Sequence, residues 1–336
     1  MLVGMKSSRS ARAPGRVNLI GEHVDYAGGS ALPLAIRQGS RVHWVKTAEA
    51  LTAFSSFDNR HINLATPHKD DPGWAAIVAK AAALTGCDRG RLEIDGDLPI
   101  GAGLSSSTSL AVALVLALGG EMNEDDLIAA SWECEQALGT PTGFLDQQAI
   151  VAGKEGQCLL IDFSTMKRRL VALDPQLHLY VIHSGIEREL LNSPYAKRRT
   201  EVRQAEDLLG PLPRADREAV RSLSDSTLGK RALHVVEECE RVHAAAHALE
   251  DGNLKTFGGL LNESHTSLRD LFDVSLARID QLVEDLQAKS DVLGARLMGG
   301  GFGGCILAAS SRELDFGTDL TWWKVEAAAG ASVHED

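Results

Sequence analysis

The sequence has few cysteines, no long apolar run and a deficit of basic charge. Its five cysteines are scattered and none forms a C-x-x-C pair, which argues against a disulfide framework or a zinc site and favours a reducing cytoplasm. The longest apolar run, Leu110–Leu118, is far shorter than the ~18 residues of a membrane helix. Residues 1–10 lack the apolar core of a signal peptide. We therefore expect a cytoplasmic protein that does not act at a membrane.

Acidic residues outnumber basic ones, with 46 Asp and Glu against 34 Lys and Arg, so the net charge is −12. Phosphate backbones select basic surfaces, and this balance argues against nucleic acid as the main partner. A small anionic ligand needs only one local cluster of donors. The 336 residues suffice for one large domain or two medium ones. We expect a monomer whose partners are small molecules.

The pattern of apolar and polar residues predicts an α+β protein in two halves. Short strand-like segments bounded by turn residues occupy residues 41–47, 60–64 and 91–95. Helical segments of the same half occupy residues 73–85, 110–118 and 124–138, the last with Asn123 as N-cap. A second sheet is expected from residues 158–163, 169–173 and 177–183, before helices that begin after residue 193 and a strand at 305–309. We expect domains at residues 1–165 and 166–336.

The most informative stretch is a Gly/Ser loop at Leu98–Thr108 (LPIGAGLSSST), just before an apolar helix. Glycines let backbone amides approach a ligand, and amides at a helix N-terminus favour an anion. Its three serines add donors and a possible Mg²⁺ ligand. No G-K-[ST] follows, so the loop is not a P-loop. A serine-capped turn is the alternative interpretation.

A second Gly-rich loop, Gly299–Gly304 (GGGFGG), matches G-x-G-x-x-G only weakly. A dinucleotide fingerprint opens a helix, whereas the residues after this loop read as a strand. The pattern therefore argues against a dinucleotide site, and a tight packing turn is the alternative.

Polar side chains gather in the segment Ala13–Tyr26 beside glycine turns, namely Arg16, Glu22, His23, Asp25 and Tyr26. Carboxylates only accept hydrogen bonds, and one carboxylate can take two neighbouring hydroxyl donors. The cluster thus suits a polyhydroxy compound. A solvated turn with ordinary ion pairs is the alternative.

Asp146 follows a Pro/Gly turn and lies next to Phe144 and Leu145. An Asp in apolar surroundings can act as a base or as a fixed acceptor that orients a hydroxyl, and Arg16 is the obvious cation to keep it ionised. A helix N-cap is the alternative role. Glu135, eleven residues earlier, could reach a metal or face water. Four other histidines are expected to face solvent, namely His68, His234, His243 and His247.

These segments, in this order, resemble the three motifs of the GHMP kinase superfamily, and the likeness spans residues 12 to about 310. Within that superfamily the chain is most similar to the galactokinase family. Gly15–Tyr26 (GRVNLIGEHVDY), followed by Leu32 and Pro33, is similar to the galactokinase signature. Ser193–Arg199 (SPYAKRR) resembles the Tyr-x-x-Arg-Arg segment of that family.

The resemblance implies a two-domain GHMP kinase-like α+β fold with the active site in the interdomain cleft, and ATP-dependent phosphorylation of the anomeric C1 hydroxyl of galactose. Asp146 would face that hydroxyl, and Arg16 would stabilise the transferring phosphoryl group. The implied sugar ligands are Glu22, His23, Asp25, Gly143 and Tyr195. The implied ATP-phosphate loop comprises Gly101, Gly103, Leu104, Ser105, Ser106 and Ser107. Mg²⁺ would be held by Ser107 and Glu135, and Gly299–Gly304 would support the site.

Two departures from the family pattern concern the sugar. Residues 141–147 (PTGFLDQ) stand where the family has Pro-Cys-Gly-x-Met-Asp-Gln, and residues 183–188 (HSGIER) replace an Asn/Asp-rich strand end. Phosphoryl transfer is unaffected by these changes, but the substrate could be a related sugar such as N-acetylgalactosamine, galacturonate or arabinose. A catalytically silent regulator that binds sugar and ATP is the alternative of a different class.

Overall fold

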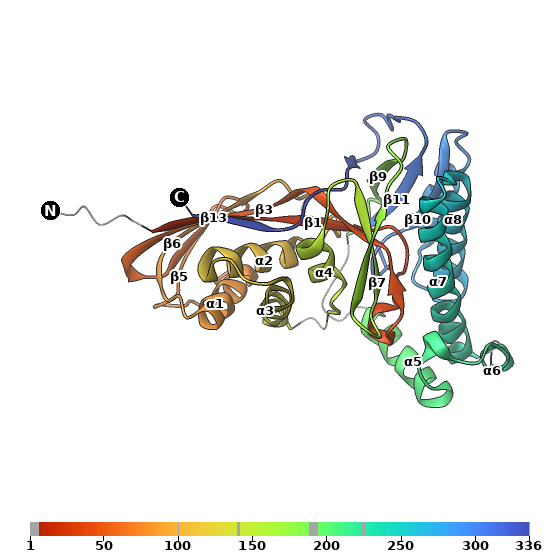
Figure 1. Ribbon diagram of the computed structural model, residues 1–336, viewed down its shortest axis with the longest axis horizontal. Helices are drawn as coiled ribbons and strands as arrows, with labels where there is room; N and C mark the ends of the chain where they lie inside the picture. The colour runs from red at the N-terminus through yellow and green to blue at the C-terminus, as the bar shows by residue number, and fades with distance from the viewer. Residues whose placement is uncertain (1–6, 100, 140–141, 188–193, 224–225, 336) are drawn as a thin grey trace.

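The computed structural model describes residues 7–99, 101–139, 142–187, 194–223 and 226–335. The molecule is elongated, with one mixed α/β lobe at each end and a small sheet between them (Figure 1). None of its helices, within these described ranges, is long and apolar enough to cross a membrane. The α+β architecture predicted from the sequence is confirmed.

The first lobe is built on a six-stranded sheet in the order β13-β1-β3-β6-β4-β5. Its strands are β1 (Ser8–Asn18), β3 (Pro33–Ala50), β4 (Thr52–Ser55), β5 (Arg60–Asn63), β6 (Arg89–Gly96) and β13 (Ser332–Glu335). Helices cover one face of this sheet (Figure 1), namely α1 (Gly73–Thr85), α2 (Ser106–Gly119), α3 (Glu124–Gln136) and α4 (Leu145–Ala152). Because α2 lies between the sheet and the other helices, its residues 108–118 are all buried. An apolar surface on every side of a helix is typical of such a central position.

The second lobe contains a four-stranded sheet in the order β10-β11-β9-β12. Its strands are β9 (His178–His183), β10 (Val292–Leu297), β11 (Cys305–Ser310) and β12 (Trp322–Val325). Its helices are α5 (Pro194–Leu209), α6 (Arg217–Ser222), α7 (Thr227–Glu250), α8 (Leu254–Asp270) and α9 (Ala277–Gln287), with short 3₁₀ turns η1 (Asp25–Ala27) and η2 (Leu212–Arg214). The sheet between the lobes has the order β2-β7-β8, from β2 (Ser30–Ala31), β7 (Gln157–Asp162) and β8 (Lys167–Ala172).

The helix predicted at residues 73–85 is confirmed as α1, which ends where Gly86 adopts a left-handed conformation. Asn123 caps α3 as predicted, because its side chain accepts a hydrogen bond from the backbone N–H of Asp126. The predicted second sheet is wrong in its membership. Only β9 joins the four-stranded sheet, whereas β7 and β8 pair with the early strand β2. Local patterning indicates a strand but does not specify its partner.

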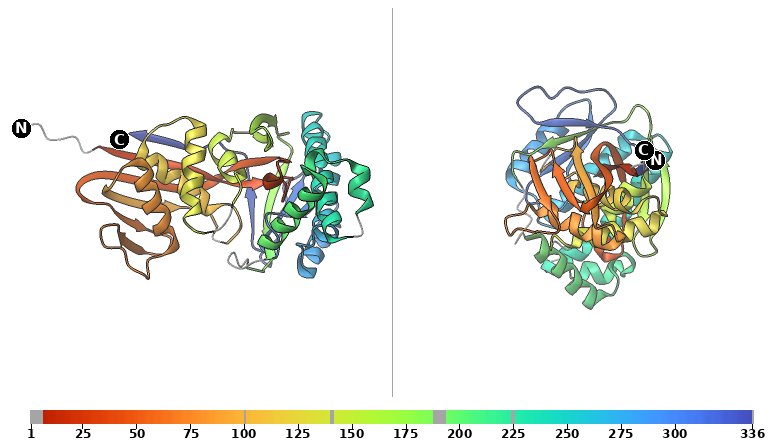
Figure 2. Two further views of the ribbon diagram at one scale, coloured as in Figure 1. Left: turned by 90° about the horizontal axis from the view of Figure 1, so that it is seen from below. Right: turned by 90° about the vertical axis from the view of Figure 1, so that its left-hand side faces the viewer.

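The two lobes share strands and core residues. Strand β1 runs from the first sheet toward the second lobe, where Val17, Leu19 and Ile20 join a core with Phe257 and Leu307. At the other end of the chain, β13 returns to pair with β1, antiparallel and in register from Arg9 opposite Glu335 to Arg12 opposite Ser332. The blue last strand therefore lies beside the red first strand in the left view of Figure 2. The division at residue 165 stays a prediction.

Candidate active site

The Gly/Ser loop lies at the start of α2 and is tied to β1. Gly101 and Gly103 have φ angles of 76° and 67°, which glycine adopts at no steric cost, and a Cβ on Gly101 would meet nothing within 4 Å. Ser105 is the N-cap residue of α2, with a φ of 61°. The backbone N–H of Arg16 donates to Leu104 O at 3.2 Å. The loop thus presents backbone at a helix N-terminus, as an anion site requires.

Asp146 lies in the first turn of α4 and forms a bidentate ion pair with Arg16. The Arg16 Nε and Nη2 atoms donate to its Oδ1 and Oδ2 atoms at 2.8 and 3.0 Å. The Ser105 hydroxyl also donates to Asp146 Oδ2. The remaining nitrogen of the guanidinium, Nη1, donates to Gly103 O at 2.6 Å. One arginine therefore joins the carboxylate to the Gly/Ser loop, across 130 residues of sequence.

Asp25 lies against Gly143 at the beginning of η1. A Cβ added to Gly143 would lie only 1.8 Å from Asp25 Oδ2, so no side chain fits there without movement. The pKa of Asp25 is raised from 3.8 to about 6, chiefly by burial and in part by the Asp146 charge. The Tyr26 backbone N–H and the Arg199 guanidinium oppose this rise. A carboxylate in such surroundings gains from hydroxyl donors.

Three aromatic rings extend this cluster. His23 has a left-handed φ of 61°, and its Nδ1 lies 3.0 Å from the Tyr26 hydroxyl oxygen. The His23 ring centroid lies 5.3 Å from that of Tyr195. Burial raises the pKa of the Tyr195 hydroxyl, with the Asp25 charge adding to the effect, so this hydroxyl remains a donor at neutral pH. The structure thus brings His23, Asp25, Gly143 and Tyr195 together, and their role as sugar ligands stays a prediction.

Glu22 is buried and its carboxylate is already held by the protein. Its Oε1 accepts from Arg296 Nη2 at 2.5 Å and from the Gly299 backbone N–H at 2.7 Å. Its Oε2 accepts from Asn18 Nδ2 at 2.5 Å. The second Gly-rich loop is therefore fixed directly to the N-terminal segment. In the same loop, a Cβ on Gly300 would lie 2.9 Å from the Tyr195 ring, so this glycine lets the ring pack closely.

Glu135, in the last turn of α3, accepts hydrogen bonds from both sides of the site. Its Oε1 accepts from the Ser107 and Thr108 hydroxyls at 2.6 and 2.8 Å, and its Oε2 accepts from Gln147 Nε2 at 2.7 Å. Burial raises the pKa of Glu135, and the Asp146 charge adds to this effect. Ser106, by contrast, begins α2 with an exposed side chain.

The surroundings of Glu135 suit a hard divalent cation. Its carboxylate and the Ser107 hydroxyl are oxygen donors, the kind that Mg²⁺ prefers, and phosphate oxygens commonly supply further ligands. Over the part of the chain that the structure describes, no Lys or Arg forms an ion pair with Glu135, and no three His, Cys, Asp or Glu side chains form a metal cluster. The pair therefore fits Mg²⁺ held jointly with a nucleotide rather than by protein alone.

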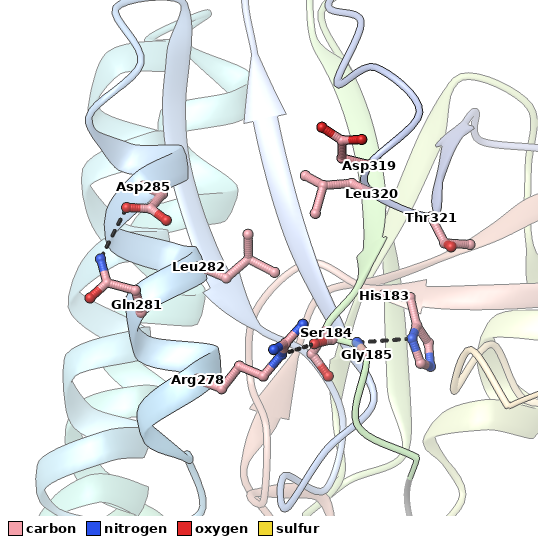
Figure 3. Close-up of a pocket in the computed structure, with 10 residues that line it drawn as sticks. All are labelled: His183, Ser184, Gly185, Arg278, Gln281, Leu282, Asp285, Asp319, Leu320 and Thr321. Atoms are coloured by element: carbon pink, nitrogen blue, oxygen red, sulfur yellow. Dashed lines mark hydrogen bonds between the residues drawn. The ribbon is translucent and has the colours of Figure 1, made fainter.

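A separate cavity of about 370 Å³ opens on the second lobe, between the end of β9, helix α9 and residues 319–321 (Figure 3). None of the predicted site residues lines it. At its base, Arg278 Nε donates to Ser184 O at 3.0 Å, and the Gly185 N–H donates to His183 Nδ1 at 3.0 Å. The Ser184 backbone N–H donates to Gly304 O at 2.9 Å, so this wall also contacts the second Gly-rich loop.

Sequence reasoning missed the buried residues that hold the N-terminal segment around Leu19 and Glu22. Arg296 is fully buried and, besides Glu22, donates from Nε to Leu19 O at 2.9 Å. A single arginine in the apolar strand Val292–Leu297 was the available signal, because a buried charge requires a partner.

The prediction that His234 faces solvent is wrong: this ring is fully buried, because α7 packs on both α8 and α5.

The buried His234 is a neutral link to the N-terminal segment. Its Nδ1 lies 2.8 Å from the Ser267 hydroxyl oxygen, and its Nε2 lies 3.1 Å from Glu22 O. A carbonyl oxygen can only accept, so the proton is on Nε2. Burial lowers the pKa of His234 to about 4, which keeps the ring neutral at physiological pH.

Three family models match the chain. They are described as the galactokinase galactose-binding signature (residues 3–44), the GHMP kinases N terminal domain (74–154) and the GHMP kinases C terminal (245–315). A galactokinase of Thermosipho africanus is 34% identical over 313 residues, which cover 89% of this chain and 88% of the relative. A galactokinase of Homo sapiens is 35% identical over 371 residues, covering 98% and 93%.

Solved structures of other proteins also superpose on the chain. Lactococcus lactis galactokinase complexed with galactose superposes with a TM-score of 0.87 at 28% identity, covering 97% of this chain and 95% of that one. L. major mevalonate kinase in complex with R-mevalonate superposes with a TM-score of 0.67 at 20% identity, covering 97% and 98%. The second likeness concerns the fold alone.

Proposed function

Because the chain belongs to the galactokinase family of GHMP kinases, as the resemblance of its motifs predicted, we propose that it transfers the terminal phosphoryl group of ATP to the C1 hydroxyl of galactose. The observation that carries this proposal is the bidentate Arg16–Asp146 pair at the junction of the Gly/Ser loop and the sugar cluster. That pair joins the two places where the donor and the acceptor would bind.

Phosphoryl transfer depends on positioning and on neutralising charge. Asp146 retains lone pairs beyond its bonds to Arg16 and Ser105, so it can accept the hydrogen of the attacking hydroxyl. Arg16 keeps the carboxylate ionised and lies next to the loop where the phosphates would bind, at Gly101, Gly103, Leu104, Ser105, Ser106 and Ser107. These residues therefore orient the acceptor and stabilise charge as it develops.

The sugar would lie against Asp25, His23, Tyr195 and the backbone of Gly143. Asp25 is an acceptor for two neighbouring hydroxyls, whereas the Tyr195 hydroxyl and the imidazole supply complementary partners. Glu22 already accepts three hydrogen bonds, so its contribution is to fix the segment and to offer its remaining acceptor capacity.

Ser107 and Glu135 would hold Mg²⁺, which when bound supplies positive charge against the ATP phosphates. The Ser107 hydroxyl donates to Glu135 Oε1 at 2.6 Å, so the two candidate ligands lie side by side. The cytoplasmic location and the monomeric state stay predictions.

The test is ADP release with Mg²⁺-ATP and a panel of free sugars: galactose, glucose, N-acetylgalactosamine, galacturonate, arabinose and talose. We expect selective turnover of galactose, and loss of turnover in Asp146→Asn with ADP binding retained. Turnover of another sugar would keep the chemistry and overturn the substrate. Binding of sugar and ATP without turnover would instead support the regulator alternative, and near-normal turnover of Asp146→Asn would remove this residue from the mechanism.

A further inference from the structure

Trp132, near the end of α3, contacts the loop that leads to Asp146 at two points. Its indole Nε1 donates a hydrogen bond to the backbone carbonyl oxygen of Thr142 at 3.2 Å. Its ring stacks on Phe144, with centroids 4.8 Å apart and planes inclined by 24°. One side chain therefore fixes the residues on both sides of Gly143.

Helix α4, which carries Asp146, begins without a side-chain cap. Phe144 occupies the N-cap position of α4 and makes no side-chain cap hydrogen bond, whereas Asn123 caps α3 with its side chain. Cap side chains normally fix where a helix begins. In α4 the N-cap residue Phe144 instead stacks on Trp132, and Asp146 lies two residues further on.

The loop has little room to move without affecting the site. Gly143 lies against Asp25, where even a Cβ would come within 1.8 Å of Oδ2. The Thr142 hydroxyl accepts from Gln136 Nε2 at 3.0 Å and donates to Glu135 Oε2 at 3.4 Å. A displacement of this loop would therefore alter the predicted sugar contacts, whereas Glu135 stays held by the Ser107 and Thr108 hydroxyls at 2.6 and 2.8 Å.

We propose that Trp132 is a positioning residue for the acceptor sugar: it holds Thr142 and Phe144 so that Gly143 stays against Asp25 and Asp146 faces the hydroxyl. This inference rests on the proposed function for the identity of the sugar. Trp132 acts through the loop rather than on the reacting atoms. Its loss therefore affects the sugar more than the nucleotide, whose loop lies at the start of α2.

The experiment compares Trp132→Ala and Trp132→Phe with Trp44→Phe as a matched control. Trp44 also donates one indole hydrogen bond, to Arg89 O at 3.1 Å. It lies near the opposite end of α2, where Arg9 contacts both the Trp44 ring and Leu118 O. The control thus loses an equivalent bond far from the loop.

We expect Trp132→Ala to raise the KM for galactose and to lower kcat/KM by about 10- to 100-fold, because a misplacement of about 1 Å can cost that much. The KM for ATP should change little. Trp132→Phe keeps an aromatic stack and should lie between Trp132→Ala and the wild type. Trp44→Phe should match the wild type.

Hydrogen exchange of the backbone amides at residues 142–148 gives a readout that does not require turnover. It should be faster in Trp132→Ala and unchanged in Trp44→Phe. Wild-type exchange and galactose KM in Trp132→Ala would overturn the proposal, as would parallel rises in the KM for galactose and for ATP. If the wild type phosphorylates no galactose, the proposed function fails, while unchanged exchange would separately refute the positioning role.

Discussion

Asp25→Asn should stabilise the protein while weakening its sugar site, because it replaces a poorly solvated carboxylate by an amide of the same size. Burial raises the pKa of Asp25 to about 6 in the folded protein, whereas the ordinary value is 3.8. The folded state therefore binds more protons than the unfolded state between about pH 4 and 6. The contribution of this group to stability falls as the pH rises through that window and is constant above it.

The size of the expected stabilisation follows from the change in the pKa of Asp25. A rise of about 2 pH units corresponds to about 3 kcal/mol of unfavourable free energy at pH 7, and partial contact with solvent reduces this to roughly 2 kcal/mol. An amide has no such cost. The free energy of unfolding of Asp25→Asn should therefore exceed that of the wild type by roughly 2 kcal/mol at pH 7, and match it below about pH 4.

Urea unfolding of both proteins from pH 4 to 8 measures this difference, with Asp88→Asn as the control because the Asp88 side chain is 87% exposed. The control should show no pH-dependent difference from the wild type. Calorimetric titration at pH 7.5 should show weaker galactose binding by Asp25→Asn, with ADP binding retained. A stability difference that is equal at pH 4 and pH 8 would refute the role of the buried charge.

Three further predictions concern single contacts. Gly143→Ala should raise the KM for galactose, because the added Cβ would displace Asp25. Gly259→Ala is the control, because its Cβ meets nothing within 4 Å, and it should leave the KM unchanged. The same KM for galactose in the two variants would show that the close contact between Gly143 and Asp25 is unimportant. Arg296→Met should lower the free energy of unfolding by about 3–5 kcal/mol in urea, because it leaves the buried Glu22 carboxylate without its cation; a loss below 1 kcal/mol would contradict this. Glu135→Gln should raise the Mg²⁺ concentration needed for half-maximal activity, and an unchanged Mg²⁺ dependence would exclude Glu135 as a ligand.

Local features were predictable because their causes are local. The helix Gly73–Thr85 has no internal breaker and ends at a glycine that can adopt a left-handed conformation, so sequence alone locates it. Asn123 followed by acidic residues marks the start of α3 in the same way. The family motifs similarly locate the Gly/Ser loop and Asp146.

Long-range features were not predictable from the residues. Chemistry suggests that Asp146 needs a cation, but only the fold brings Arg16 to it. One of the two partners of β7 is a strand about 130 residues earlier, at Ser30 and Ala31, and nothing in the pattern of β7 specifies that partner. His234 lies on α7, which packs on α5, α6 and α8. Its side chain is therefore buried, although a helix with one buried face would leave it exposed.

The return of β13 to the edge of β1 makes completion of the first sheet depend on residues more than 300 positions later in the sequence, since Arg9 pairs with Glu335. Until residues 332–335 are available, β1 presents unpaired backbone groups along Arg9–Arg12, and such edges invite pairing with other chains. Separate expression of residues 1–165 would therefore yield a fragment prone to association. The chain therefore passes between the lobes twice next to this pair of strands, once after β1, where Leu19 and Ile20 join the core of the second lobe, and once between β12 and β13.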